Sequence, residues 1–389
     1  VSHWIALTAA LVFVSHPIQT QSVTYIVQRM TSLCVLFYLA ALLLYIYGRT
    51  AEAPRRRGTL WAGGFVCWIL ALGSKEIAVT LPLTILLYEW YFFQDLSASW
   101  VKKNAKFGLL VLVLLGLVAW AYLGSEPLDR LLAGYAERDF TLGQRLLTQL
   151  RVVMFYLSLL VFPDPSRLNL THHIVTSESL LEPITTLLSM AGIFGLLGLA
   201  IYLAPRHRII SFCLLWFFLH LVIESSAIAL EMIFEHRLYL PMFGFSLLVA
   251  WLLYTLAGRK SWWPVAVAGV VCLLLAVGTY QRNRAWQDAV TLWSDASSKS
   301  PQNARAHNNL GNALEGLGRH QEAVGHYQQA LRIKPDYPEA HNNWGSALAN
   351  QRRLPEAAEQ YRRALRLKPD FSAARDNLRR IEELLQQKT

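Results

Sequence analysis

Charged residues are scarce in this 389-residue sequence: they make up 16% of it, whereas 54% of the residues are hydrophobic. Soluble domains carry about 25% charged residues, so most of this chain does not have the composition of one. The deficit is local, because residues 1–280 contain nearly all of the long apolar runs and residues 281–389 resemble an ordinary soluble helical protein. We therefore expect an all-α protein in which a polytopic helical membrane domain, 1–280, precedes a soluble domain.

Several chemical signatures are also missing. The four cysteines all lie inside apolar runs and form no CxxC pair, which excludes a disulfide framework and a cysteine metal site. No Gly-rich phosphate loop, nucleophile elbow or HExxH motif occurs, so a nucleotide-sugar donor is not supported. We expect no metal and no cofactor. The sequence begins at Val1 inside an apolar stretch, and we expect the true N-terminus to lie upstream.

The net charge of +10 is distributed in a way that argues for membrane orientation and against nucleic-acid binding. Basic residues gather in short loops between apolar runs, and such loops are expected on the cytoplasmic side. They lie at Gly48–Gly58, Lys102–Lys106, Arg206–Arg208 and Arg259–Lys260. The opposite, extracytoplasmic side then receives residues 16–30, 74–76, 124–183, 224–237 and everything from 281 onward.

The apolar segments number ten, at 4–15, 31–47, 59–73, 77–93, 107–123, 146–162, 184–203, 209–223, 238–257 and 262–280. If each segment crosses the membrane, counting forward from Lys106 and backward from Arg206 places both 124–145 and 163–183 on the extracytoplasmic side. Segment 146–162 then begins and ends on the same side. Segment 146–162 also contains Gln149 and Arg151, which a lipid-facing span rarely tolerates. We therefore predict about nine spans and one re-entrant or interfacial segment.

The C-terminal domain repeats every 34 residues, as Pro301, Pro335 and Pro369 illustrate. This period, with small residues at fixed positions, predicts tetratricopeptide (TPR) repeats, each a pair of antiparallel helices. We expect a half-repeat at 284–300, repeats at 303–336 and 337–370, and a capping helix at 371–387. Asn309, Asn343 and Asn377 recur at this period, and their amides could bind the backbone of an acceptor peptide or could simply be surface residues.

Polar residues of the membrane domain gather on the extracytoplasmic side. If residues 16–30 are helical, Gln21, Tyr25, Gln28 and Arg29 form one polar face, facing a lipid headgroup or merely anchoring the helix. If residues 231–235 are helical, Glu231 and Glu235 are i,i+4 neighbours. Surplus cations at this depth suggest a lipid phosphate site, and the candidates are Arg151, Arg237, Arg29, Lys75 and Arg167. The candidates for supporting catalytic roles are Glu76, Glu231, Glu235 and His236.

Several of these motifs together resemble those of the transmembrane-and-TPR-containing (TMTC) O-mannosyltransferase-like proteins, especially bacterial relatives. The resemblance rests on the repeats and on His16-Pro-Ile-Gln-Thr-Gln21, Lys75-Glu76, Pro165-Ser-Arg-Leu-Asn169 and Glu235-His-Arg-Leu-Tyr-Leu-Pro241. It implies a GT-C type membrane domain and a polyprenyl-phosphate sugar donor. Eukaryotic members often have His and Glu where this chain has Gln19 and Gln21. In GT-C enzymes the catalytic acid lies in the first extracytoplasmic loop, which we expect upstream of Val1, so no catalytic base is named here.

These expectations describe a multi-pass protein, in a bacterial inner membrane with its TPR domain in the periplasm or outside. Its function would be to transfer mannose or another hexose from a polyprenyl-phosphate carrier to a protein acceptor bound by the TPR domain. Its partners would be the lipid bilayer, the lipid-linked sugar and the acceptor protein. Two alternatives stay open: a non-enzymatic TPR-bearing scaffold or assembly factor, and a protein of the O-antigen-ligase or oligosaccharyltransferase type.

Overall fold

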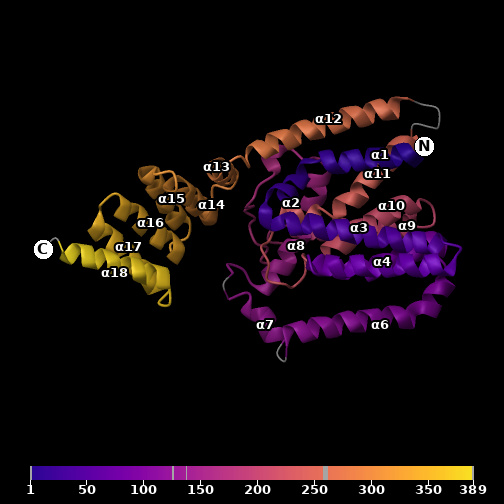
Figure 1. The fold of residues 1–389 in the computed structure, drawn as a ribbon, viewed down its shortest axis with the longest axis horizontal. Coiled ribbons are helices and arrows are strands. Elements are labelled where there is room, and N and C mark those ends of the chain that lie inside the picture. Colours follow the sequence, from indigo (N-terminus) through magenta and orange to yellow (C-terminus); the bar gives the residue numbers. More distant parts are fainter. Residues whose placement is uncertain (1, 125–126, 137, 257–261, 388–389) are drawn as a thin grey trace. The chain divides into compact units, whose positions relative to one another are not determined.

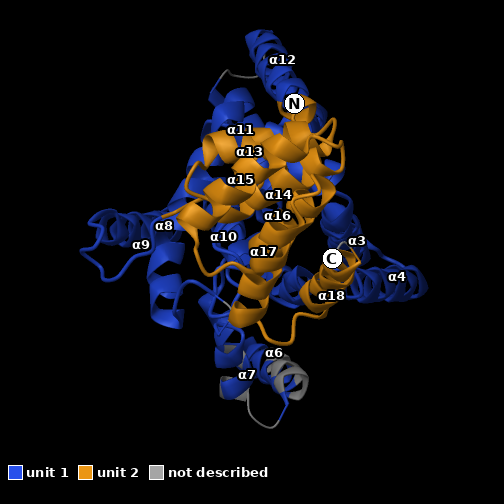
Figure 2. Cartoon of the chain, turned by 90° about the vertical axis from the view of Figure 1, so that its left-hand side faces the viewer, with its two compact units in different colours: residues 1–168, 175–281 blue, residues 169–174, 282–389 orange. Residues whose placement is uncertain are grey.

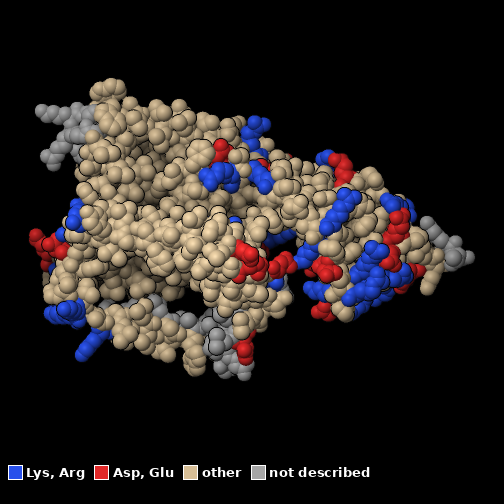
Figure 3. All heavy atoms as spheres, turned by 180° about the vertical axis from the view of Figure 1, so that it is seen from behind, with Lys and Arg blue, Asp and Glu red and all other residues tan. Residues whose placement is uncertain are grey.

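The computed structural model describes residues 2–124, 127–136, 138–256 and 262–387, and within them the chain is helical with no strand. The all-α prediction is therefore confirmed. The chain forms two compact units (Figure 2): unit 1 comprises residues 1–168 and 175–281, and unit 2 comprises residues 169–174 and 282–389. Charged side chains are dense over the TPR helices and sparse over most of the face of unit 1 that Figure 3 draws.

Each of the ten apolar segments forms a helix in unit 1 (Figure 1). The long helices are α1 (Ser2–Ser15), α3 (Arg29–Thr50), α4 (Pro54–Leu72), α5 (Leu81–Tyr88), α6 (Ala98–Leu123), α8 (Leu142–Val161), α9 (Thr185–Leu203), α10 (Arg208–Leu221), α11 (Pro241–Leu256) and α12 (Trp263–Arg284). Short elements lie between them: η1 (Pro17–Gln19), α2 (Thr20–Thr24), η2 (Ile26–Gln28), η3 (Glu76–Thr80), η4 (Glu89–Phe93), α7 (Pro127–Ala133), η5 (Pro165–Arg167) and η6 (Glu235–Leu238).

Four helical segments of the described chain are long and apolar enough to cross a membrane: Ile26–Thr50, Glu76–Phe93, Thr185–Leu203 and Trp263–Arg284. Three more are apolar but shorter, at Ser2–Ser15, Arg208–Leu221 and Pro241–Leu256. The protein therefore has the helices of a membrane protein, while the expected nine spans stay a prediction. Segment 146–162 lies within α8, one unbroken helix, and whether α8 crosses a membrane also stays a prediction.

Ion pairs and hydrogen bonds group the loops at two ends of the bundle. At one end, Arg49 at the end of α3 binds Glu89 at 2.7 Å, and Arg208 at the start of α10 pairs with Asp95. At the other end, the segments after α1, after α4 and after α10 meet. The basic loops that contain Arg49 and Arg208 thus share the first end, and the polar loops after α1, α4 and α10 share the second.

Two local expectations are wrong. Residues 16–30 are not one helix, because Tyr25 is extended between α2 and η2, so the predicted polar face does not form. Residues 231–234 are not helical, so Glu231 and Glu235 are not i,i+4 neighbours; η6 begins only at Glu235. In both segments, buried polar contacts with distant parts of the chain outweigh helix propensity.

Unit 2 contains the repeats as helix pairs, α14 (Ala304–Glu315) with α15 (His320–Ile333) and α16 (Pro338–Asn350) with α17 (Leu354–Leu367). Helix α13 (Ala289–Lys299) precedes them and α18 (Ser372–Gln386) follows. Each pair packs closely, because a glycine in its first helix faces a tyrosine ring of its second. A Cβ added at Gly311 would lie 2.5 Å from Tyr327, and one at Gly345 would lie 2.8 Å from Tyr361.

Residues 169–174 group with the TPR helices, unlike the expected division at 280. The reason is Asn169, whose buried amide donates to Ser300 Oγ at 2.9 Å. Burial also removes Asn169 from the accessible surface that glycosylation of its Asn-Leu-Thr sequon requires.

Candidate functional site

The two most specific sequence motifs meet at the second end of unit 1. Gln21 Oε1 accepts a hydrogen bond from the backbone N–H of His236 at 2.8 Å, and both residues are buried. This bond joins α2 to η6 across most of the membrane domain's sequence. The His-Pro-x-Gln-x-Gln and Glu-His-Arg motifs therefore belong to one site.

His16 fixes the entry of the first motif. Its Nδ1 accepts from Ile18 N at 3.2 Å, which leaves the proton of a neutral ring on Nε2 to donate to Leu160 O at 3.1 Å. Burial lowers the pKa of His16 to about 4, so the ring is neutral at physiological pH. His16 is thus an anchor for the turn before η1.

Lys75 enters the same site from the turn between α4 and η3. Its Nζ lies 2.9 Å from Glu224 Oε1 and 3.2 Å from Thr31 Oγ1. An ammonium group has three N–H donors, so one donor is left for another partner. The carboxylate that pairs with Lys75 is Glu224, whereas Glu76 is exposed at the start of η3.

Arg237 is the second cation of the site and is 2% exposed. Its guanidinium donates to the backbone carbonyls of Met232 at 3.1 Å and Glu231 at 2.8 Å, and its buried Nε has no hydrogen-bond partner. Burial, together with the charges of Lys75 and Arg237, lowers the pKa of His236 to about 2. His236 is therefore a neutral imidazole, and its buried Nδ1 is also unpartnered.

Helix α8 supports the segment that joins α10 to η6. Arg145, which is fully buried, donates to the carbonyls of Glu224, Ser226 and Leu230. One turn further along α8, Gln149 donates to Met232 O at 2.9 Å. Two turns beyond that, the Tyr156 hydroxyl bonds both backbone groups of Phe234. These contacts fix the path of the chain into His236 and Arg237.

The remaining candidate residues lie elsewhere. Arg151 donates to Val175 O at 2.7 Å, and Arg167 to Ser158 Oγ at 2.6 Å, so neither shares a partner with Arg237. Arg29 is exposed and donates to Val23 O. Glu231 pairs through its carboxylate with Arg138 at 2.7 Å, and Glu235 is buried in η6. The structure therefore brings together Lys75, His236 and Arg237, with Glu235 beside them in sequence.

Arg145 was missed in the sequence, whereas Glu224 and Gln19 were noted there only as members of a polar loop and of the His16 motif, without a role in the site. Arg145 had a detectable signal, because Arg145, Gln149, Val152 and Tyr156 repeat at helical spacing along one buried face. The pairing of Glu224 with Lys75 had no such signal, because the two residues are 149 positions apart in the sequence.

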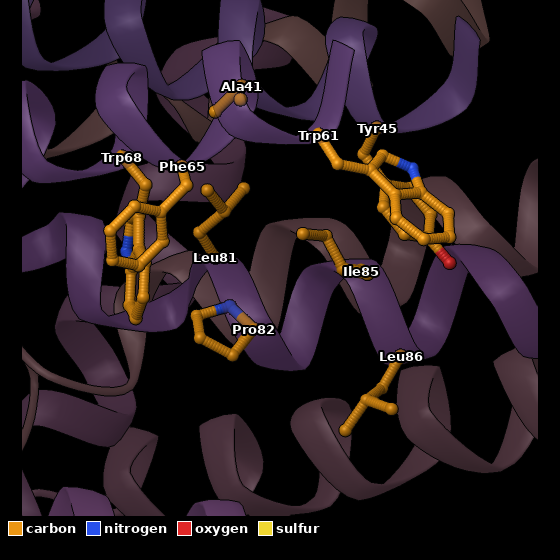
Figure 4. A pocket seen from close by; sticks show the side chains of 10 residues that line it. Ala41, Tyr45, Trp61, Phe65, Trp68, Leu81, Pro82, Ile85 and Leu86 are labelled. Atoms are coloured by element: carbon orange, nitrogen blue, oxygen red, sulfur yellow. The ribbon is translucent and has the colours of Figure 1, made fainter. Parts of the chain in front are cut away.

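An apolar groove lies among α3, α4 and α5, away from these polar residues. It has a volume of about 290 Å³. Tyr45 with Trp61 and Phe65 with Trp68 stand at its two ends, and Leu81, Pro82 and Ile85 lie between them (Figure 4). The Trp68 indole donates to Ala78 O, three residues after Lys75, so one end of the groove is near the Lys75 turn in sequence.

In unit 2, the predicted peptide-binding asparagines form part of a chain of hydrogen bonds. Asn377 donates to Asn342, Asn342 to Asn343, Asn343 to Asn308, and Asn308 to Asn309, over 3.0–3.3 Å. The chain crosses from α18 through α16 to α14. These bonds order the amides before any peptide binds. Each of the four donating amides keeps one N–H that the series does not use, and Asn309, which only accepts, keeps two.

Metal ligation finds no support within the described residues, where no three His, Cys, Asp or Glu side chains gather as ligands. Comparisons with known proteins match residues 278–338 and 338–371 to tetratricopeptide repeat families. The chain is 27% identical to the protein O-mannosyl-transferase Tmtc3 of Drosophila melanogaster, over 85% of this chain and 41% of that protein. It is 26% identical to a protein O-mannosyl-transferase of Caenorhabditis elegans, over 86% of this chain and 46% of that protein.

Among solved structures, the Arabidopsis OM64 TPR domain is similar, with 26% identity, a TM-score of 0.25, and coverage of 26% of this chain and 85% of that domain. The chain spans less than half the length of the curated relatives it matches. The curated relatives and the matched repeats indicate the same family as the motifs that meet at His236. The resemblance of this chain to the TMTC protein O-mannosyltransferase family is therefore confirmed over 85% of its length.

Proposed function

We propose that the full-length protein is a membrane glycosyltransferase that transfers a hexose, such as mannose, from a polyprenyl-phosphate carrier to a hydroxyl group of an acceptor protein on the extracytoplasmic side. The main support is the convergence of Lys75, His236 and Arg237 where the two family motifs meet. The names of the relatives, protein O-mannosyl-transferases, support the same reaction class.

In the proposed reaction, the acceptor oxygen attacks the anomeric carbon and the bond from that carbon to the phosphate oxygen breaks. The electron pair leaves with the polyprenyl phosphate, and the hydroxyl proton goes to a base that we do not assign. Negative charge grows on the leaving phosphate, and the free donor of Lys75 and the guanidinium of Arg237 would stabilise it. Neutral His236 avoids adding a third positive charge beside them.

The other parts of the chain fit the same scheme. The apolar groove would take part of the isoprenoid chain, since its walls are aromatic and aliphatic. The ordered asparagine chain would bind the acceptor polypeptide through its remaining N–H groups. The phosphate itself would lie at Lys75 and Arg237, and Arg151, Arg167 and Arg29 would contribute at most to the surrounding potential, because their partners lie elsewhere.

The test uses full-length protein in liposomes, a polyprenyl-phosphate mannose donor and a serine-rich acceptor peptide. A charge-assisted hydrogen bond contributes roughly 1.5–3 kcal/mol, so Arg237→Gln or Lys75→Gln should lower donor use about ten- to a hundredfold. Arg206→Gln, at the opposite end of the bundle, should leave transfer unchanged. If the substituted proteins melt as the wild type does and transfer normally, the phosphate site is wrong. Absence of transfer by the wild type with any polyprenyl donor would favour the scaffold alternative.

A further inference from the structure

The end of unit 1 where the segments after α1, α4 and α10 meet contains buried polar atoms without hydrogen-bond partners. Gln19 is 5% exposed, and neither atom of its amide is hydrogen-bonded. Gln21 and Glu224 are each 1% exposed; Gln21 leaves Nε2 unpartnered and Glu224 leaves Oε2 unpartnered. Buried polar side chains are nearly always hydrogen-bonded, so three incomplete ones in one place point to a ligand or to bound water.

These atoms are close to the two cations. Glu224 binds Lys75 through its other carboxylate oxygen at 2.9 Å, and Gln21 binds the backbone of His236, the neighbour of Arg237. Gln19 belongs to η1, which packs directly on η6. Hydroxyl groups of Thr20, Ser22 and Ser225 are buried and unpartnered in the same segments.

The kinds of unpartnered atom distinguish between possible ligands. A phosphate group offers only acceptors at neutral pH, so it suits the cations and the amide N–H groups. It does not suit Gln19 Oε1 or Glu224 Oε2, which are themselves acceptors. A sugar hydroxyl both donates and accepts, and it satisfies a carboxylate oxygen and an amide together. A glycosyl phosphate presents both kinds of group side by side.

We propose that Gln19, Gln21 and Glu224 bind the hydroxyl groups of the donor's hexose, next to the phosphate held by Lys75 and Arg237. This inference rests on the proposed function, and it adds the groups that select a glycosylated lipid over the bare lipid phosphate. The Lys75–Glu224 pair then has two roles: Lys75 faces the phosphate and Glu224 accepts from a hydroxyl. The sugar hydroxyls would form the hydrogen bonds that these unpartnered atoms lack.

The test measures binding of two short probes, farnesyl-phosphate mannose and farnesyl phosphate, to the whole chain in lipid nanodiscs. The wild type should bind the glycosylated probe at least tenfold more tightly. Gln19→Met should reduce this preference about tenfold and leave farnesyl phosphate binding unchanged. Because the Gln19 amide has no hydrogen bond to lose, the melting temperature of this variant should stay the same or rise. Gln94→Met, at the opposite end of the bundle, is the matched control and should keep the preference.

Each other outcome is informative. Equal wild-type affinity for the two probes, or an unchanged preference in Gln19→Met, overturns the sugar site while the phosphate site survives. A lower melting temperature in Gln19→Met with an unchanged preference means that water completes the amide, and this also overturns the inference. Failure of the wild type to bind either probe, measured again with the full-length protein, counts against the proposed function itself.

Discussion

Arg145 and Arg237 are buried guanidinium groups that bind backbone carbonyls, and neither forms an ion pair within the described residues. Their environments differ in one respect. All three guanidinium nitrogens of Arg145 donate hydrogen bonds to carbonyls of the 224–230 segment. In contrast, Arg237 Nε has no hydrogen-bond partner, and neither has Nδ1 of the adjacent His236. A saturated buried cation stabilises structure, and an unsaturated one is available to a ligand.

We expect Arg145→Gln to destabilise the protein strongly. It would leave up to three carbonyls, one buried and two partly buried, without these donors, and a buried one costs roughly 1–3 kcal/mol. Arg151→Gln, which removes a partly exposed contact on the same helix, should lower the melting temperature much less. Thermal unfolding of the chain in detergent measures both. Equal melting temperatures would contradict the supporting role given to Arg145.

His326 predicts a pH dependence in the TPR unit. Burial and the neighbouring His307, 3.4 Å away, lower the pKa of His326 below 6.5, with Glu322 opposing weakly. In the unfolded chain the imidazole has the higher pKa, about 6.5, and binds a proton more readily than in the folded repeat. The contribution of neutral His326 to the free energy of unfolding is therefore complete above about pH 7 and is lost as the pH falls through 6.5. The next repeat has Gln360 at this position, bonded to His341 at 2.9 Å.

We therefore expect hydrogen-exchange protection of α14 and α15 to fall between pH 7.5 and pH 5.5, and to fall less in His326→Gln. Protection in α17 serves as an internal control and should change little. An identical pH profile in the variant would show that another group is responsible.

At the scale of elements, the asparagine chain couples three helices in series. Asn343 takes part in two of its bonds and Asn309 in one, so Asn343→Ala should lower the free energy of unfolding by roughly 2 kcal/mol and Asn309→Ala by roughly 1. Denaturant unfolding followed by the far-ultraviolet circular dichroism of the repeats measures the difference. Equal effects of the two substitutions would mean that the asparagine hydrogen bonds do not stabilise one repeat against the next.

Acceptor binding gives these asparagines a second test. Replacing Asn309, Asn343 and Asn377 together should weaken binding of an acceptor peptide. Because the chain also stabilises the repeats, the binding must be compared at a temperature where the variant remains folded. Unchanged affinity under those conditions would leave the asparagines with a structural role only.

The groove among α3, α4 and α5 makes a prediction about the lipid tail. Leu86→Trp should fill part of the groove and displace about two methylene equivalents, weakening binding of a long polyprenyl phosphate roughly tenfold. Ile69→Trp, on the exposed face of α4, is the matched control. If Leu86→Trp binds the lipid as the wild type does, the tail lies elsewhere.

For the whole molecule, composition and periodicity were sufficient to predict the class of every long element. All ten apolar runs are helices, and the 34-residue period places the repeat helices where they occur. The site was predicted only in part. Gln21 and His236 were recognised as motif residues, but hydropathy and spacing describe neighbours within an element and not the pairing of Lys75 with Glu224. Arg151 was preferred to Arg145 because an isolated charge in an apolar run is visible in sequence, whereas bonds to backbone carbonyls are not.

The basic loops predict the orientation of the protein in the membrane. We expect the TPR unit to lie outside the cytoplasm. A cysteine in place of exposed Gln387 should react with a membrane-impermeant thiol reagent in intact cells, or in spheroplasts if an outer membrane intervenes. Labelling that appears only after the inner membrane is broken would reverse the topology, and with it the side assigned to Lys75 and Arg237.

The most direct measurement is an experimental structure of the full-length protein with a polyprenyl-phosphate mannose bound. We expect phosphate oxygens about 3 Å from Lys75 Nζ and the Arg237 guanidinium, with sugar hydroxyls at Gln19 and Glu224. A phosphate bound at Arg151 or Arg167, or a donor that leaves the segment from His236 to Arg237 untouched, would contradict this expectation.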